Sequence, residues 1–218
     1  MRRMASRGDR TREHLLDVAE QLFGTDGVAN VSLRQIRIAA GQRNEGAVQY
    51  HFTDRDGVIR ALSGRHMPGI QAIQDRIVAG HRARPTLRDL VDAFTRPLAE
   101  YAALGPSERA WMKILAELVS DPKLSLETVR DNSPTDVAGV GRAIYEDLAG
   151  RCGPDLAVER IWAVAQFVIH IVADRARLLD EPQAARPLSS NDAFVDNLVD
   201  MAYGALTARV VRTVAPEP

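Results

Sequence analysis

Apolar side chains recur along this chain at the spacing of an α-helix. In residues 11–28, Leu15, Ala19 and Phe23 fall on one helical face, and the pattern stops at Gly24. The same period returns in later segments, and none alternates between apolar and polar residues as a half-buried strand does. The pattern therefore predicts an all-α protein whose first helix ends at Gly24.

Residues 33–52, LRQIRIAAGQRNEGAVQYHF, contain two short helical patterns joined by a turn. Ser32, with Gln35 three residues later, predicts a capping box at the start of the first helix. Gly41 is expected to end that helix, because glycine adopts the left-handed conformation at low cost. Asn44 is expected to cap the second helix. Such a pair is typical of a helix-turn-helix, whose second helix enters the DNA major groove.

Longer helical patterns follow, separated by glycine and proline. Thr53 is expected to cap a helix that runs to about residue 79 and is kinked or split at Pro68. Further helices are expected at residues 86–101, 107–120, 125–149, 155–180 and 191–213. We therefore expect a three-helix head in residues 1–55 and a larger helical body in residues 56–218.

Charge and cysteine content narrow the class of protein. The net charge is only −1, yet the first twelve residues hold five arginines against one aspartate. This basic arm either follows the phosphate backbone or is a solvated terminus. Cys152 is the only cysteine, which excludes an internal disulfide and favours a reducing compartment. No apolar run approaches the roughly 20 residues of a membrane helix, and no secretory signal is recognised, so a cytoplasmic location is expected.

A set of residues in the first quarter of the chain agrees in order and spacing with one known family. They are Thr11, Arg12, Ala19, Leu22, Phe23, Gly27, Ser32, Leu33, Ile36, Ala39, Ala40, Gly41, Gly46, His51, Phe52 and residues 54–57. On these residues the chain resembles the tetracycline-repressor (TetR) family of bacterial transcription regulators. It departs from the family pattern by one additional residue in the turn, and a tyrosine usual at the position of Gln49 stands at Tyr50 instead.

The second helix of the motif and its surroundings supply the candidate DNA-binding residues. They are Arg34, Arg43, Asn44, Glu45, Ala47, Val48, Gln49, Tyr50, His51 and Thr53. Gln49 is suited to a bidentate pair with adenine, Arg43 to guanine or phosphate, and Ala47 to a thymine methyl group. Tyr50, His51 and Thr53 are expected at the DNA backbone, where contacts position without specifying. For His51, packing inside the head is the alternative.

The resemblance implies two further properties of the body. The last two helices would form a four-helix bundle with a second copy, so that two heads read a palindromic operator in double-stranded DNA. The body would also hold a small, largely apolar effector, with candidate residues chosen for their mixed apolar and polar character. They are Phe94, Leu98, Tyr101, Trp111, Leu115, Tyr145, Trp162, Gln166 and His170. An ordinary helical core has the same composition and is the alternative for each of them.

The sequence as a whole favours a ligand-responsive regulator, which is expected to act as a repressor. A helical-bundle enzyme and an architectural DNA-binding protein are the two alternatives. A helical-bundle enzyme is disfavoured because no metal-ligand spacing, phosphate-binding loop or nucleophile elbow is present. A ligand-independent architectural DNA-binding dimer is disfavoured by the near-neutral charge and the large body that carries aromatic residues. We expect neither a cofactor nor a metal, and no membrane partner.

Overall fold

The computed structural model describes residues 6–209 apart from residue 82, residues 121–134, residue 182 and residues 184–185. Within these residues every regular element is a helix, so the predicted all-α class is confirmed. The helices are α1 (Arg7–Asp26), α2 (Leu33–Ala39), α3 (Ala47–Phe52), α4 (Arg55–Ala79), α5 (Leu87–Ala102), α6 (Pro106–Val119), α8 (Thr135–Cys152), α9 (Pro154–Asp180) and α10 (Asn191–Thr207).

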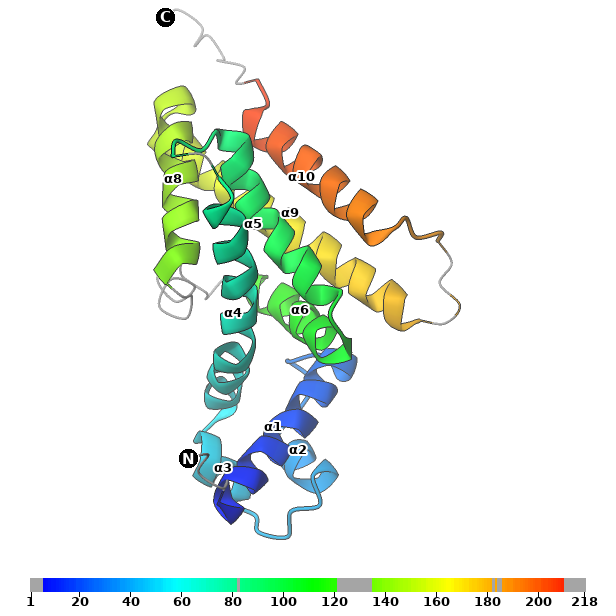
Figure 1. The fold of residues 1–218 in the computed structure, drawn as a ribbon. Coiled ribbons are helices and arrows are strands. Elements are labelled where there is room, and N and C mark those ends of the chain that lie inside the picture. Colours follow the sequence, from blue (N-terminus) through cyan, green and yellow to red (C-terminus); the bar gives the residue numbers. More distant parts are fainter. Residues whose placement is uncertain (1–5, 82, 121–134, 182, 184–185, 210–218) are drawn as a thin grey trace, which may run out of the picture.

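The molecule is elongated, with a small head at one end and a larger body at the other (Figure 1). Helices α1, α2 and α3 form the head, and α4 runs from the head into the body. Helix α5 packs against α4, α8 and α10, while α9 packs against α6, α8 and α10. Helix α6 also contacts α1, so the body meets the head at a second place besides α4.

The first helix is longer at both ends than its apolar pattern predicts. Ser6 caps it with Asp9 in a capping box, and it continues to Asp26 before Gly27, which has a φ of 90°. The predicted end at Gly24 is therefore wrong. Gly24 instead lies against α6, where an added Cβ would come 2.8 Å from the Ala110 Cβ. The glycine permits close helix packing, which a local pattern does not distinguish from a helix end.

Helix α4 remains a single helix through Pro68, so the predicted split does not occur. Proline removes one backbone donor from the helix, but buried side chains on both sides of it, including Leu62 and Ile70, hold the segment in the core. At the other end of the body, α8 begins at Thr135, and the predicted helical residues 125–134 lie outside the described residues. Helix α10 ends at Thr207, earlier than predicted.

Helix α9 is long and apolar enough to cross a membrane, with a mean hydropathy of 1.6 over an 18-residue window. The expectation that no apolar run approaches that length is therefore wrong. Such a helix is weak evidence for a membrane span, because the core helix of a soluble protein has the same length and composition. Here α9 packs between α6, α8 and α10, and its Val168, Val172 and Ala173 are buried among them.

Candidate nucleic-acid interface

The head is built around one small apolar core. Phe23 of α1, Ile36 of α2 and Phe52 of α3 are all at most 5% exposed. The predicted capping box of α2 is present: Gln35 N–H donates to Ser32 Oγ over 3.2 Å, and Ser32 N–H donates to Gln35 Oε1 over 2.8 Å. These bonds satisfy two backbone donors at the start of a helix of only seven residues.

The turn between α2 and α3 occupies residues 40–46, and Gly41 has the expected left-handed backbone with a φ of 64°. Arg37 donates to the Gln42 carbonyl oxygen over 2.9 Å and so braces the turn from α2. Asn44 does not cap α3 as predicted. Its Oδ1 accepts from Gly46 N–H over 3.1 Å, and α3 starts one residue later without a side-chain cap. The asparagine stabilises the turn instead, a common alternative use of this side chain.

The six residues of α3 divide sharply between core and solvent. Gln49 is exposed and Tyr50 is 84% exposed, as a surface that reads DNA requires. Ala47 and Val48 are only 6% and 2% exposed, because they pack into the head with Phe52. Ala47 therefore packs in the core, and its contact with a thymine methyl group stays a prediction. Val48 contributes to the surface only as one of the residues that line a groove between α2 and α3.

A groove of about 250 Å³ lies between α2 and α3. It is lined by Leu33, Arg34, Arg37, Glu45, Val48 and Gln49. Two guanidinium groups, one carboxylate and one amide thus share this groove, and the exposed Tyr50 follows Gln49 on α3. The guanidinium and amide groups can donate to phosphate oxygens and to base edges, whereas the carboxylate can only accept, for example from a cytosine amino group. Arg43 and Asn44 are exposed in the adjoining turn. Arg37, which also lines the groove, was not among the leading candidates for DNA binding in the sequence.

The connection from α3 to α4 is strained. Thr53 has a φ of 68° and a ψ of −59°, and the Asp54 N–H donates to the Phe52 carbonyl oxygen over 2.8 Å. This is a classic γ-turn, a conformation rare for a β-branched residue. Thr53 is not the cap of α4 as predicted. Asp54 caps it, because its Oδ1 accepts from the Gly57 N–H over 2.7 Å.

His51 and Thr53, the remaining candidates of the head, differ in exposure. His51 is half-buried, and its ring lies edge-on to Tyr50 with 5.0 Å between centroids, so it both packs and borders the exposed surface. Thr53 is exposed at the end of α3. The structure thus brings Arg34, Glu45 and Gln49 to one surface, while Ala47 lies in the core.

The nine effector candidates are spread through the body. Leu98, Tyr101 and Trp111 are buried, and Phe94, Leu115, Tyr145, Trp162, Gln166 and His170 are half-buried. The His170 Nδ1 donates to the Gln166 carbonyl oxygen over 2.8 Å, and its Nε2 lies 3.0 Å from Ser120 Oγ. None of the nine lines either the groove of the head or a groove of about 400 Å³ between α5 and α10.

Comparisons with known proteins find a curated relative by sequence and several solved structures by fold. No family model matches the chain. A segment of 61 residues is 43% identical to the "HTH-type transcriptional regulator AcrR" of Shigella flexneri, and the match covers 28% of this chain and 28% of that protein.

Solved structures extend the similarity to nearly the whole fold. NalD, described as the secondary repressor of the MexAB-OprM multidrug efflux pump in Pseudomonas aeruginosa, is 20% identical with a TM-score of 0.55, covering 90% of this chain and 95% of that one. AmtR of Mycobacterium smegmatis is also 20% identical, with a TM-score of 0.53 and coverages of 95% and 94%. A tetR-family regulatory protein of Rhodococcus RHA1 is 14% identical, with a TM-score of 0.52 and coverages of 90% and 97%.

Proposed function

We propose that the chain is a TetR-family regulator of transcription, because its fold is similar to that of a tetR-family regulatory protein and a segment of 61 residues matches a curated regulator. The main support for this proposal is the surface of α2 and α3, which exposes Arg34, Gln49 and Tyr50 to solvent over a well-packed core. Residues 1–55 are the DNA-binding head in this proposal, and residues 56–218 form the effector and dimerisation body. A cytoplasmic location follows from access to DNA.

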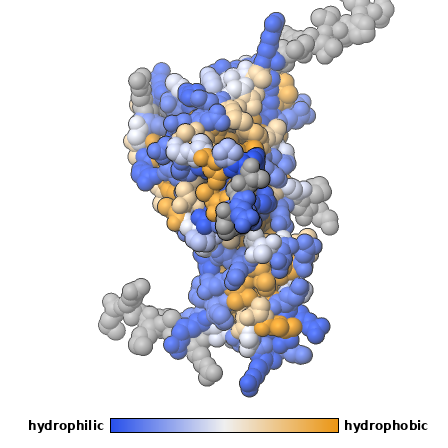
Figure 2. All heavy atoms as spheres, turned by 90° about the vertical axis from the view of Figure 1, so that its right-hand side faces the viewer, coloured by the Kyte–Doolittle hydropathy of each residue, from blue (hydrophilic) through white to orange (hydrophobic). Residues whose placement is uncertain are grey.

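A homodimer through α9 and α10 is the second part of the proposal. One exposed face of α10 carries the small or apolar residues Ala193, Met201, Gly204 and Ala205, with Asn197 among them. Met201 is 45% exposed, and Val158 of α9 is 39% exposed. Figure 2, which views the molecule from the right-hand side of Figure 1, shows hydrophobic residues exposed on the body among hydrophilic ones. Small side chains permit close helix approach, and a second copy would cover this surface.

Two copies would give the protein its sequence preference. One head presents few groups to bases, whereas two heads about one helical turn apart read both halves of a palindrome. Ala173 and Ala202 are fully buried within the single chain, so they pack its own core, while Ala163 and Ala205 remain exposed.

We propose that the body binds a small, largely apolar effector and that its binding releases the DNA, so that the protein acts as a repressor. Support comes from the size of the body, which exceeds what dimerisation requires, and from half-buried aromatic residues such as Phe94, Tyr145 and Trp162. An effector that prefers the body geometry with mis-spaced heads must weaken DNA binding by the same factor. A preference of about 2 kcal/mol lowers operator affinity about thirtyfold.

The test is binding of the purified protein to DNA fragments from around its own gene at one stated salt concentration. The double variant Gln49→Ala, Tyr50→Ala should lose tight binding, whereas Gln183→Ala, on the exposed connection before α10, should retain it. Weak binding without sequence preference, retained by the double variant and steeply dependent on salt, would instead identify an architectural DNA-binding protein.

A further inference from the structure

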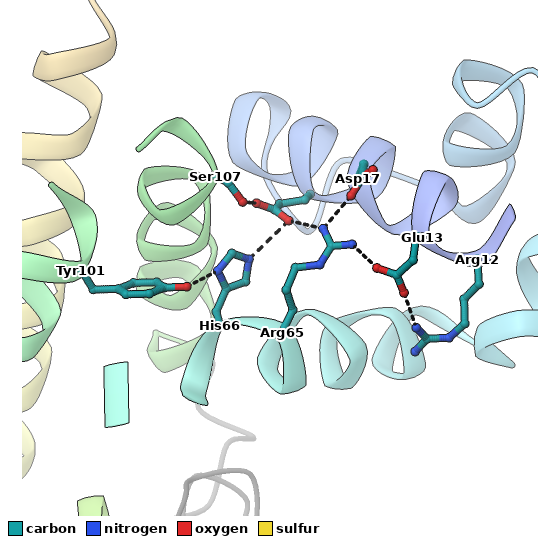
Figure 3. Close-up of polar contacts among 8 residues, drawn as sticks. Arg12, Glu13, Asp17, Arg65, His66, Tyr101 and Ser107 are labelled. Carbon is teal, nitrogen blue, oxygen red and sulfur yellow. Dashed lines mark hydrogen bonds and ion pairs between the residues drawn. The ribbon is translucent and has the colours of Figure 1, made fainter. Parts of the chain in front are cut away.

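A cluster of polar side chains lies where the head meets the body, between α1, α4, α5 and α6 (Figure 3). Its centre is Glu20 of α1, which is 4% exposed. Arg65 and His66 reach it from α4, and Ser107 reaches it from α6. A carboxylate that belongs to the head is therefore held by two helices that lead into, or belong to, the body.

The Glu20 carboxylate uses both oxygens. Oε2 accepts from Arg65 Nη1 over 2.9 Å and lies 3.3 Å from His66 Nε2, and Oε1 accepts from the Ser107 hydroxyl. Arg65 is further bound by Glu13 and Asp17 of α1, each over 2.8 Å. The guanidinium thus clamps three carboxylates of the head to α4. Burial raises the pKa of Glu20, but bonds from His66, Ser107 and Arg65 outweigh it and lower the pKa below its usual value.

His66 continues the chain of contacts into α5. Its Nδ1 lies 2.8 Å from the Tyr101 hydroxyl oxygen, and its ring stacks on Trp111 of α6 at 5.2 Å between centroids and 6° between planes. Burial raises the pKa of Tyr101 to about 12, so the phenol keeps its proton. When the phenol donates to Nδ1, the neutral imidazole carries its own proton on Nε2, the nitrogen that faces Glu20.

The hydrogen bond of this imidazole with Tyr101 and its weaker contact with Glu20 depend on each other. If Glu20 withdraws, Nε2 loses the nearby carboxylate that stabilises its proton, and at 3.3 Å that contact is already too poorly aligned for a full hydrogen bond. If Tyr101 withdraws, Nδ1 is left without its donor inside an apolar site. Leaving a buried polar group without a partner costs more free energy than an ordinary hydrogen bond contributes. We therefore expect Glu20 and Tyr101 to change position together.

We propose that Glu20, His66 and Tyr101 form a relay that couples the conformation of the body to the position of the head. Glu20 and Tyr101 are its positioning residues, acting on opposite nitrogens of one imidazole. The arrangement of α1 that binds DNA and the packing of α5 and α6 around Trp111 then belong to one equilibrium. This inference rests on the proposed DNA-binding function for its biological role, but the relay itself exists in the protein without DNA.

The first test uses DNA as the ligand and Trp111 as the reporter, since coupling between two sites is reciprocal. Trp162→Phe leaves Trp111 as the single tryptophan of the chain. Addition of a DNA fragment that binds should change its emission, and Glu20→Gln in the same background should reduce that change several-fold at saturating DNA. Asp26→Asn, an exposed carboxylate at the end of the same helix, is the matched control and should keep the full change. An unaltered emission change in Glu20→Gln, or none in the Trp162→Phe protein that binds DNA, overturns the relay.

The second test needs no DNA and separates the two proposals. Unfolding in urea is measured for Glu20→Gln, Tyr101→Phe and the double variant, with Asp26→Asn paired to Tyr101→Phe as the control cycle. The two relay residues do not bond to each other, yet their effects on the unfolding equilibrium constant should deviate from additivity by at least about threefold. Additive effects overturn the relay whether or not DNA binds. Failure to bind any DNA, with a non-additive cycle, overturns only the proposed function.

Discussion

The start of α4 offers a sharp test of the head, because one substitution has opposite expected effects at two positions of the same helix. At Gly57 an added Cβ would lie 1.7 Å from the Phe52 carbonyl oxygen and 2.8 Å from its carbonyl carbon. Those atoms are backbone at the end of α3, so relief requires α3 and α4 to separate by more than an ångström. At Gly64, which is exposed in the middle of α4, an added Cβ meets nothing within 4 Å.

The magnitudes follow from these surroundings. Gly64→Ala should stabilise the protein by up to about 1 kcal/mol, because alanine loses less backbone entropy than glycine in a helix. Gly57→Ala should destabilise it by about 3 kcal/mol, the upper range for overpacking, since no flexible side chain can yield. The expected difference between the two variants is therefore about 4 kcal/mol.

Urea unfolding followed by circular dichroism measures both effects, and DNA binding is measured on the same samples. Gly57→Ala should lose DNA binding beyond its loss of stability, because the displaced α3 carries Gln49 and Tyr50. Gly64→Ala should bind as the parent protein does. Equal stability of the two variants would refute the close approach of α4 to the Phe52 carbonyl on which the reasoning depends.

Two further predictions concern strain and charge. Thr53→Gly should stabilise the protein by about 1 kcal/mol, because relief of the γ-turn strain exceeds the added entropy cost of glycine. Urea unfolding measures this change, and a loss of stability in the variant would show that the turn is unstrained. Burial raises the pKa of Asp180, but its ion pairs with Lys113 and Arg109, both at 2.5 Å, outweigh burial and lower it. That stability is present above the unfolded pKa near 3.8 and is lost as pH falls through the folded value. Asp180→Asn should therefore lower the thermal midpoint more at pH 7 than at pH 2, and an equal loss at both values would contradict this.

The helix-turn-helix was predictable because its determinants are local. Ser32 and Gln35 lie within one turn of each other, and Gly41 needs only its own backbone preference. The starts of α3 and α4 were misplaced by the same logic. Asn44 and Thr53 both have cap-forming side chains, and which residue caps a helix depends on how the chain enters it. That entry is set by the packing of Phe52 and Gly57, which no local pattern reveals.

The amino-acid sequence by itself determined the all-α class, the capping box of α2, the presence of a helix-turn-helix and the exposed position of Gln49 and Tyr50. These depend on helical period and on residues a few positions apart. Tertiary structure alone decided that Ala47 is core, that Gly24 is a contact with α6, and that Glu20, His66 and Tyr101 meet. The last three residues lie on separate helices, and the packing of α1, α4 and α5 rather than any spacing along the chain brings them together.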